Sequence, residues 1–268
     1  MERTIRSRSH PLVRRVTGLL RDAGRREEER CFVVEGRRLA SEALGSSLHV
    51  ELALIASDLL RDDTARPLCE AILDRGIECR SLSGGALRAA QDADAPQGVA
   101  LVVRMPEADL DRVANSDGDR LVVVAWHVQD PGNLGAIIRA AEAAGASGVV
   151  TTRGGADPFH PRAVRGSAGS ILRVPVARES DPSSLPSRLR SRGLSIAAAV
   201  PRGGTRYDRA DLAGPLALLV GSEGSGLPPE LERSVDLRVT IPMMGRVESL
   251  NVAVSTALLL FEARRQRL

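Results

Sequence analysis

Short apolar runs alternate with stretches of helical spacing along most of this chain. Apolar runs such as residues 31–36, which end at a glycine, and residues 121–127 predict buried strands. Between them, apolar residues recur every three or four positions, which predicts amphipathic helices. This repeated strand–helix alternation predicts an α/β fold, with open and mostly parallel sheets covered by helices.

The first block of alternation covers residues 1–105 and predicts a small α/β domain. Its predicted strands span residues 31–36, 50–55, 79–82 and 99–104. Its predicted helices span residues 10–22, 37–44 and 65–75, with a charged break at 25–30. The acidic run at residues 106–119 has Gly and Asp but little apolar periodicity, so we expect a linker there.

The second block covers residues 120–268 and predicts a larger domain with a mostly parallel sheet. Its predicted strands span residues 121–127, 148–151, 171–176, 194–200, 215–220 and 237–241. Its main predicted helices are an Ala-rich one that follows residues 130–135 and runs through 139 to 144, and two others at 181–193 and 252–264. The first of these strands is apolar throughout, as expected for a strand buried on both faces of a parallel sheet.

The composition excludes several classes of protein. With 43% hydrophobic and 26% charged residues, the chain is expected to be globular rather than disordered. We find no apolar run of about 18 residues, so no membrane span is expected, and the first ten residues do not resemble a secretory signal. Three unclustered cysteines and four dispersed histidines predict neither a disulfide framework nor a metal site. We therefore expect a cytoplasmic protein without a metal.

Arginine supplies the whole positive charge of the chain. The net charge is only +3, but all 37 basic residues are arginine. Nine of them lie in residues 1–30, against five acidic residues. This basic N-terminal arm is either a solvated segment or an RNA contact. Aromatic residues make up only 2% of the chain, which argues against a base-stacking platform.

Three polar clusters follow predicted strands of the second block. Asn133 and Arg139 follow the strand at 121–127, Gly221–Leu227 follows 215–220, and residues 241–256 follow the last strand. Ligands of open α/β sheets bind at the carboxyl ends of strands, so one cleft could hold all three clusters. A Rossmann nucleotide site is the rival interpretation, but these glycines do not have the G-x-G-x-x-G order and they come late in the chain. There is also no P-loop signature.

In this order, the three clusters resemble the motifs of the SpoU-type RNA 2′-O-ribose methyltransferases of the SPOUT superfamily. Residues 32–39 and 97–100 likewise resemble the L30e-like substrate-binding domain of ribosomal-RNA members. The resemblance implies a C-terminal α/β knot, with a deep trefoil knot formed by the last two motifs, and a homodimer through that domain. It also implies S-adenosyl-L-methionine (AdoMet) as methyl donor.

The resemblance assigns roles to individual residues. AdoMet would be held by backbone groups of Gly221, Ile241 and Leu250, with Met243 nearby. The catalytic set would be Asn133, Arg139, Glu223, Ser249 and Asn251.

Arg139 is the residue on which we place most weight. A guanidinium group does not give up its proton in proteins and is a poor base, so we expect Arg139 to grip the target phosphate and stabilise the forming alkoxide. Asn133 would hold Arg139 or the ribose, and Glu223 would orient these groups. Arg165 is a candidate phosphate contact. Each residue also has an ordinary structural interpretation: a solvated helix arginine, a loop carboxylate or a helix cap.

The sequence therefore predicts AdoMet-dependent 2′-O-ribose methylation of RNA, with 23S rRNA favoured by the N-terminal domain. A thiostrepton-resistance type of rRNA methylation belongs to the same interpretation. The alternatives are a tRNA 2′-O-methyltransferase, a non-catalytic RNA- or ribosome-binding protein of the same fold, and a Rossmann-type small-molecule enzyme. The sequence leaves open which nucleotide is modified, whether AdoMet binds before RNA, and whether the N-terminal arm contacts RNA.

Overall fold

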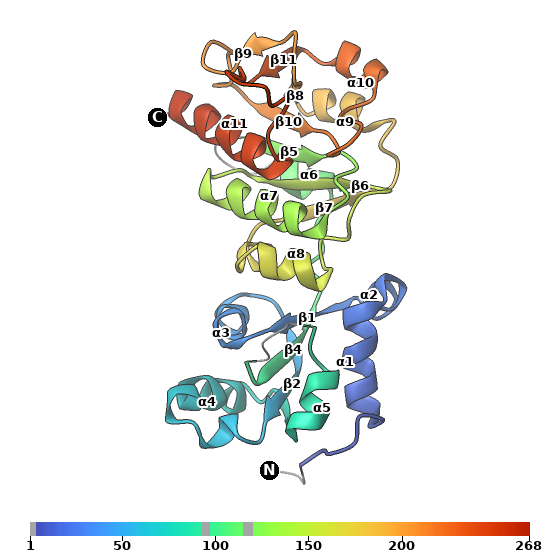
Figure 1. The fold of residues 1–268 in the computed structure, drawn as a ribbon, viewed down its shortest axis with the longest axis vertical. Coiled ribbons are helices and arrows are strands. Elements are labelled where there is room, and N and C mark those ends of the chain that lie inside the picture. Colours follow the sequence, from blue (N-terminus) through green and yellow to red (C-terminus); the bar gives the residue numbers. More distant parts are fainter. Residues whose placement is uncertain (1–3, 93–96, 115–119) are drawn as a thin grey trace. The chain divides into compact units, whose positions relative to one another are not determined.

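The computed structural model describes residues 4–92, 97–114 and 120–268 of the chain. Its contacts divide the chain into two compact units (Figure 1). The N-terminal unit comprises Met1–Pro106 and Phe159–Leu172, and the C-terminal unit comprises Glu107–Pro158 and Arg173–Leu268. The segment Phe159–Leu172 thus lies with the N-terminal unit although its sequence interrupts the second block.

The N-terminal unit is built on a four-stranded mixed sheet. Its strands are β1 (Cys31–Glu35), β2 (Val50–Ala56), β3 (Glu78–Leu82) and β4 (Val99–Arg104), in the order β1-β4-β2-β3. β4 pairs antiparallel with both β1 and β2, and β2 pairs parallel with β3. These are the four strands that the apolar runs predict.

Helices cover this sheet in two pairs. α1 (Pro11–Arg21) packs against α5 (Gly84–Ala89), and α3 (Arg37–Gly45) packs against α4 (Arg66–Asp74). Figure 1 shows the two pairs on opposite sides of the sheet. Two 3₁₀ turns, η1 (Leu59–Arg61) and η2 (Asp63–Ala65), lead into α4, and α8 (Pro161–Gly166) packs against β1.

A helix replaces the charged break expected at residues 25–30. α2 (Ala23–Glu29) begins at Asp22, whose carboxylate accepts a hydrogen bond of 2.8 Å from the amide of Gly24. The side chain of Arg26 is buried and donates to the carbonyl of Leu19 at 2.6 Å. Because this buried arginine satisfies the end of α1, the run of charges forms a helix where polarity alone predicted a break.

The C-terminal unit contains a seven-stranded parallel sheet, in agreement with the predicted sheet type. Its strand order is β7-β6-β5-β10-β8-β11-β9, and every pair is parallel. The strands are β5 (Leu121–Ala125), β6 (Gly148–Thr152), β7 (Val176–Glu179), β8 (Ser195–Ala199), β9 (Thr205–Arg206), β10 (Leu216–Val220) and β11 (Leu237–Thr240).

Two helical layers enclose this sheet. α7 (Pro131–Ala143) and α11 (Val252–Gln266) lie side by side on one face, where α7 packs against β5 and β6 and α11 against β10 (Figure 1). Apolar side chains of α6 (Leu110–Ala114), α9 (Leu185–Ser191) and α10 (Pro229–Ser234) join the core on the other face. Within the described residues, no helix is long and apolar enough to cross a membrane.

Two elements differ from the predicted ones. The run at 171–176 is not a continuous strand: η3 (Ser170–Leu172) precedes β7, because the amide of Leu172 bonds the nearby carbonyl of Gly169 at 3.0 Å. The expected linker at 106–119 contains α6, whose apolar residues Leu110 and Val113 are buried in the core. Residues 115–119 of that run lie outside the described residues.

Candidate active site

The site begins where β5 and β10 end beside each other. These strands are paired in register, so the segments that follow them emerge at the same edge of the sheet. After β5 the chain enters α7, whose first turn is fixed by Pro131 and by the Asp130 carboxylate, which accepts from the amide of Asn133 at 2.9 Å. This cap places the Asn133 side chain next to the loop that follows β10.

A chain of side-chain hydrogen bonds joins the three sequence motifs. Asn251 donates through Nδ2 to Oδ1 of Asn133 at 2.9 Å. Asn133 in turn donates through Nδ2 to Oε1 of Glu223 at 2.8 Å. Asn133 thus meets two residues that lie 90 and 118 positions further along the chain, as the order of strands predicted.

The Glu223 carboxylate is held as an anion. It also accepts from the backbone amides of Gln129 at 3.1 Å and Asp130 at 3.3 Å. Burial alone would raise the pKa of Glu223, but these hydrogen bonds and that from Asn133 outweigh burial and lower its pKa. Glu223 therefore acts as a fixed acceptor that orients Asn133, and it is a weak base at neutral pH.

Asn251 has a second role at the start of α11. Its Oδ1 accepts from the amides of Ala253 at 2.9 Å and Val254 at 3.3 Å, which makes it the N-cap of the helix. One amide side chain therefore fixes the start of α11 with its oxygen and reaches Asn133 with its nitrogen.

A cavity of about 580 Å³ adjoins this hydrogen-bond chain. Its walls come from the loops that follow β8, β10 and β11 and from the first turns of α11. It contains all four predicted cofactor-binding residues and three of the predicted catalytic ones. These lining residues are Gly221, Glu223, Ile241, Met243, Ser249, Leu250 and Asn251.

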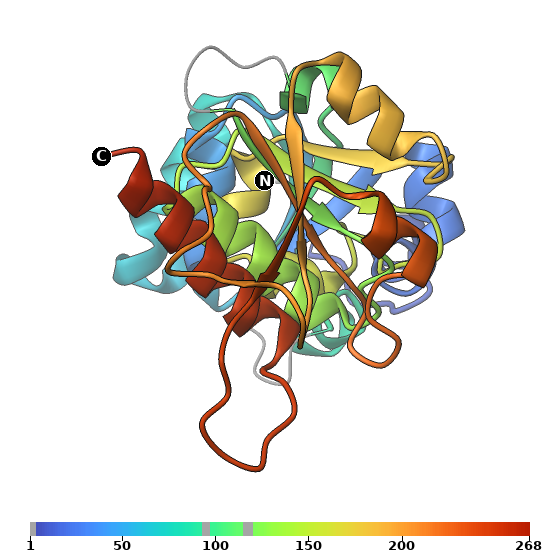
Figure 2. The ribbon, with the colours of Figure 1, turned by 90° about the horizontal axis from the view of Figure 1, so that it is seen from above.

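The loop between β11 and α11 offers free backbone groups to the cavity. Figure 2 shows this loop extending away from the sheet before the chain enters α11. Across the described chain, we find no hydrogen bond from the backbone of residues 241–250 to another backbone group. A ligand held largely by main-chain donors and acceptors, as expected for AdoMet, fits such a lining.

Gly221 is required by a close approach within the chain itself. A Cβ at Gly221 would lie 2.3 Å from the carbonyl carbon of Gly226, so the loop cannot close on a larger residue. A Cβ at Gly224, in contrast, would meet no atom within 4 Å. Besides its expected backbone contact with AdoMet, Gly221 is therefore needed for the approach of residues 226 and 227.

Arg139 stands apart from the hydrogen-bond chain. It lies on α7 six residues after Asn133, roughly 9 Å further along the helix axis, and does not line the cavity. Its side chain is exposed and has no hydrogen-bond or ion-pair partner among the described residues. Ser249 lines the cavity and likewise has no such partner within the described part.

Arg165 lies in the N-terminal unit, on α8. Its guanidinium contacts Glu35 at 3.0 Å and Asp92 at 2.9 Å, and the Glu35 side chain is only 3% exposed. The neighbouring Phe159 ring packs against Phe32 at 4.9 Å between centroids. These contacts give Arg165 a structural task, and its expected contact with a phosphate remains a prediction.

Sequence reasoning missed Gln129 and Asp130. Besides its amide bond to Glu223, Gln129 donates through Nε2 to the carbonyls of His127 at 2.9 Å and Gly154 at 2.8 Å. The pair Asp130-Pro131 is a recognisable helix start, and that signal could have identified the turn. In the residues that the structure describes, no cluster of His, Cys, Asp and Glu could hold a metal ion.

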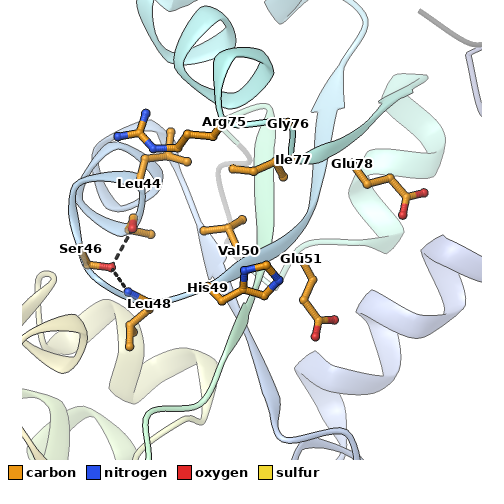
Figure 3. Close-up of a pocket in the computed structure, with 11 residues that line it drawn as sticks. Leu44, Ser46, Leu48, His49, Val50, Glu51, Arg75, Gly76, Ile77 and Glu78 are labelled. Carbon is orange, nitrogen blue, oxygen red and sulfur yellow. Dashed lines mark hydrogen bonds between the residues drawn. The ribbon is translucent and has the colours of Figure 1, made fainter.

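A second cavity, of about 370 Å³, lies in the N-terminal unit and contains none of the predicted site residues. It lies at the ends of α3 and α4 and the starts of β2 and β3. Figure 3 shows His49 and Arg75 at its margin and the Ser46 hydroxyl occupied by hydrogen bonds.

Known proteins resemble both units of the chain. Residues 120–261, more than half of the chain, match the SpoU rRNA Methylase family, and residues 11–101 match the MRM3-like substrate binding domain. The 23S rRNA (guanosine(2553)-2′-O)-methyltransferase RlmP of Bacillus subtilis is 36% identical over 239 residues, which is 89% of this chain and 90% of that protein.

Solved structures extend the match to the fold. The AdoMet-bound rRNA methyltransferase from Sinorhizobium meliloti has a TM-score of 0.86 and 31% identity, and the match covers 99% of this chain and 98% of that one. The SpoU methyltransferase AviRb from Streptomyces viridochromogenes, in complex with AdoMet, has a TM-score of 0.85 and 30% identity over 96% of this chain and 98% of that one. The chain belongs to the SpoU rRNA methylase family.

Proposed function

We propose that this protein transfers a methyl group from AdoMet to a ribose 2′-hydroxyl of 23S rRNA. The observation that carries the proposal is the hydrogen-bonded chain Asn251–Asn133–Glu223 beside the 580 Å³ cavity. The relative RlmP is named as a 23S rRNA methyltransferase, which supports 23S rRNA as the substrate. Two structural neighbours contain bound AdoMet, which supports AdoMet as the methyl donor.

The cavity is the proposed AdoMet site. Backbone groups of Gly221, Ile241 and Leu250, which line the cavity, would hold the cofactor, with Met243 nearby. AdoMet supplies an activated methyl group when it is bound. The chain itself supplies a fixed position for that group, because the loop glycines and the capped start of α11 define the cavity walls.

The RNA side of the reaction falls to Arg139, Asn133 and Glu223. Arg139, which is exposed and has no ion-pair partner among the described residues, grips the target phosphate and stabilises the forming alkoxide, while the hydroxyl proton leaves to phosphate or water. Asn133, locked by Glu223 and Asn251, orients the ribose or Arg139. Ser249 completes the pocket.

The proposed assembly is a homodimer through the C-terminal unit. α11 exposes three apolar side chains at positions i, i+4 and i+7: Val254 (49% exposed), Leu258 (41%) and Phe261 (52%). Such a stripe on a helix is a natural contact for a second copy. Because α7 packs beside α11, Arg139 belongs to the same helical layer.

The finer features of the fold are part of the same proposal. We assign the C-terminal domain, residues 120–268, a deep trefoil knot formed by the last two motifs. Residues 1–105 form an L30e-like RNA-binding domain, with 1–30 as its basic arm; residues 106–119 connect it to the next domain and include α6, which packs in the core of the C-terminal unit. The match of residues 11–101 to a substrate-binding domain supports rRNA rather than tRNA as the substrate.

Replacement of Arg139 tests the function. We expect Arg139→Ala to abolish transfer of labelled methyl from AdoMet to 23S rRNA, while AdoMet affinity stays unchanged. Arg233→Ala is the matched control, because Arg233 is an exposed arginine of α10 on the opposite face of the sheet. The unfolding free energy of both variants should lie within about 0.5 kcal/mol of that of the parent.

The outcomes separate the alternatives. Transfer to tRNA alone would keep the chemistry and overturn the assigned substrate. AdoMet binding without transfer to either RNA or to ribosomal particles would favour a non-catalytic RNA-binding protein. Absence of AdoMet binding would refute the proposed enzyme.

A further inference from the structure

Two stretches of the N-terminal unit carry positive charge without any negative charge. Residues 4–21 and 82–91 together contain six arginines and no aspartate or glutamate. The segment 159–172 of the same unit also has arginine without acidic residues, but its Arg165 pairs with Glu35 and Asp92. The remainder of the unit mixes both signs, so this segregation is a local property and does not follow from the small net charge of the chain.

The fold brings the two stretches together on one face of the sheet. Ile5 bridges Leu82, and the amide of Ser83 donates to the carbonyl of Ile5 at 2.9 Å. On α1, the hydroxyl of Thr17 donates to the carbonyl of Ala89 at 2.6 Å. Ile5, α1 and α5 therefore form one continuous surface, which we call the α1–α5 face.

Most arginines of this face have no acidic partner. Arg15 is the exception, because it pairs with Glu29 at 2.6 Å and Glu51 at 2.7 Å. The others are exposed and form no ion pair with any described residue; Arg8 alone makes a hydrogen bond, to a backbone carbonyl. These five arginines are Arg6, Arg8, Arg14, Arg21 and Arg88.

Three of these arginines lie near the hydrogen bond between Thr17 of α1 and Ala89 of α5. On a helix, residues at i−3 and i+4 lie on the same side as residue i, so Arg14 and Arg21 flank Thr17. Thr17 is bonded to Ala89, the neighbour of Arg88. Arg14, Arg21 and Arg88 thus surround the junction of α1 and α5.

The face offers charge without an apolar anchor. In the described part of the N-terminal unit, the large apolar side chain with high exposure is Leu73 (53%), and it lies on α4, on the other side of the sheet. Protein partners usually bind through a buried aromatic or aliphatic anchor. A polyanion needs only paired charges, and the planar guanidinium matches phosphate in a bidentate way.

We propose that the α1–α5 face binds the phosphate backbone of the RNA substrate through its five exposed arginines, Arg6, Arg8, Arg14, Arg21 and Arg88. The inference rests on the proposed function, since it names the surface that holds the RNA during methyl transfer. Such contacts position the RNA and carry no sequence information of their own.

The test compares two triple variants of the full-length chain. The first carries Arg14→Gln, Arg21→Gln and Arg88→Gln. The control carries Arg38→Gln, Arg61→Gln and Arg75→Gln, which removes the same charge from the α3–α4 side of the sheet. The binding of unmethylated 23S rRNA transcripts is measured over a series of salt concentrations, and AdoMet affinity is measured separately by calorimetry.

We expect the first variant alone to lose RNA affinity, by roughly tenfold or more at low salt. Each lost phosphate contact should reduce the slope of log K against log salt by about 0.7 to 0.9, so three lost contacts reduce it by about two. The control variant should keep the parent slope, and both variants should bind AdoMet normally and keep the parent melting temperature.

Equal slopes for the parent and the first variant would overturn the inference. So would a first variant that keeps its RNA slope but loses binding to ribosomal proteins or to anionic vesicles, because the face would then serve another partner. The proposed function is tested independently: if the parent binds RNA but transfers no methyl group, the enzyme proposal fails and the slopes still decide the surface.

Discussion

Asn251 does two jobs with one side chain, and substitution can separate them. Its Oδ1 caps α11 and its Nδ2 reaches Asn133. Asn251→Ser keeps a capping oxygen but is too short to reach Asn133, whereas Asn251→Ala removes both interactions. The two variants therefore differ by the cap alone, and Asn251→Ser differs from the parent by the link to Asn133.

The magnitudes follow from the geometry. Loss of an N-cap costs about 1 kcal/mol, and loss of a hydrogen bond between two exposed amides costs roughly 0.5 kcal/mol, at the low end of the usual range. One kcal/mol shifts the melting temperature of a domain of this size by about 2–4 °C. We expect Asn251→Ala to melt about 3–6 °C below the parent and Asn251→Ser about 1–2 °C below it.

In contrast to their melting temperatures, the activities of the two variants should fall together. Both variants lose the bond that locks Asn133, so both should transfer methyl at least roughly tenfold more slowly, since a small misplacement of a positioning group is costly. Calorimetric melting and single-turnover transfer to 23S rRNA check the two effects. Full activity in Asn251→Ser would refute the role of the hydrogen-bond chain, and equal melting of the two variants would refute the cap.

Three further predictions concern the same unit. The pKa of Glu223 is lowered in the folded protein, so its carboxylate stabilises the fold above its ordinary pKa of 4.5, and this stability is lost as pH falls through the lowered value. In denaturant titrations at a series of pH values, the difference in unfolding free energy between the parent and Glu223→Gln should shrink over that range. A difference that stays constant would contradict this. Gly221→Ala should destabilise the unit by about 1–3 kcal/mol and weaken AdoMet binding, because its Cβ would meet Gly226 at 2.3 Å. Gly214→Ala, where a Cβ meets no atom within 4 Å and which does not line the cavity, should leave both unchanged in calorimetry. Phe261→Asp should convert the proposed dimer to monomer in analytical ultracentrifugation, and an unchanged dimer would place the interface elsewhere.

The sequence was a good guide to strands. Buried runs such as residues 121–127 and 215–220 became β5 and β10 within two residues, because strands buried on both faces leave an unbroken apolar signal. The prediction of a mostly parallel sheet and of the SpoU family is confirmed. Helices held by single polar groups were harder: α2 depends on the cap at Asp22 and on a buried arginine, and no periodicity marks either.

The site was predicted in part. Asn133, Glu223 and Asn251 were expected in one cleft, and the structure joins them by hydrogen bonds. Gln129 was missed because it contributes mainly backbone and local contacts, which carry no residue-type signal. The roles assigned to Arg139 and Ser249 depend on groups outside this chain, so they remain predictions.

The segment Phe159–Leu172 has a consequence for how the gene could be rearranged. The family match of residues 120–261 includes this segment, yet its contacts are with the N-terminal unit, through Phe32 and Glu35. The backbone therefore passes between the units three times, near residues 106, 158 and 172. A chimaera that exchanges only residues 1–105 would leave Phe159 and Arg165 facing a foreign surface. A viable exchange of substrate-binding domains must therefore replace two separate pieces of chain, residues 1–106 and 159–172.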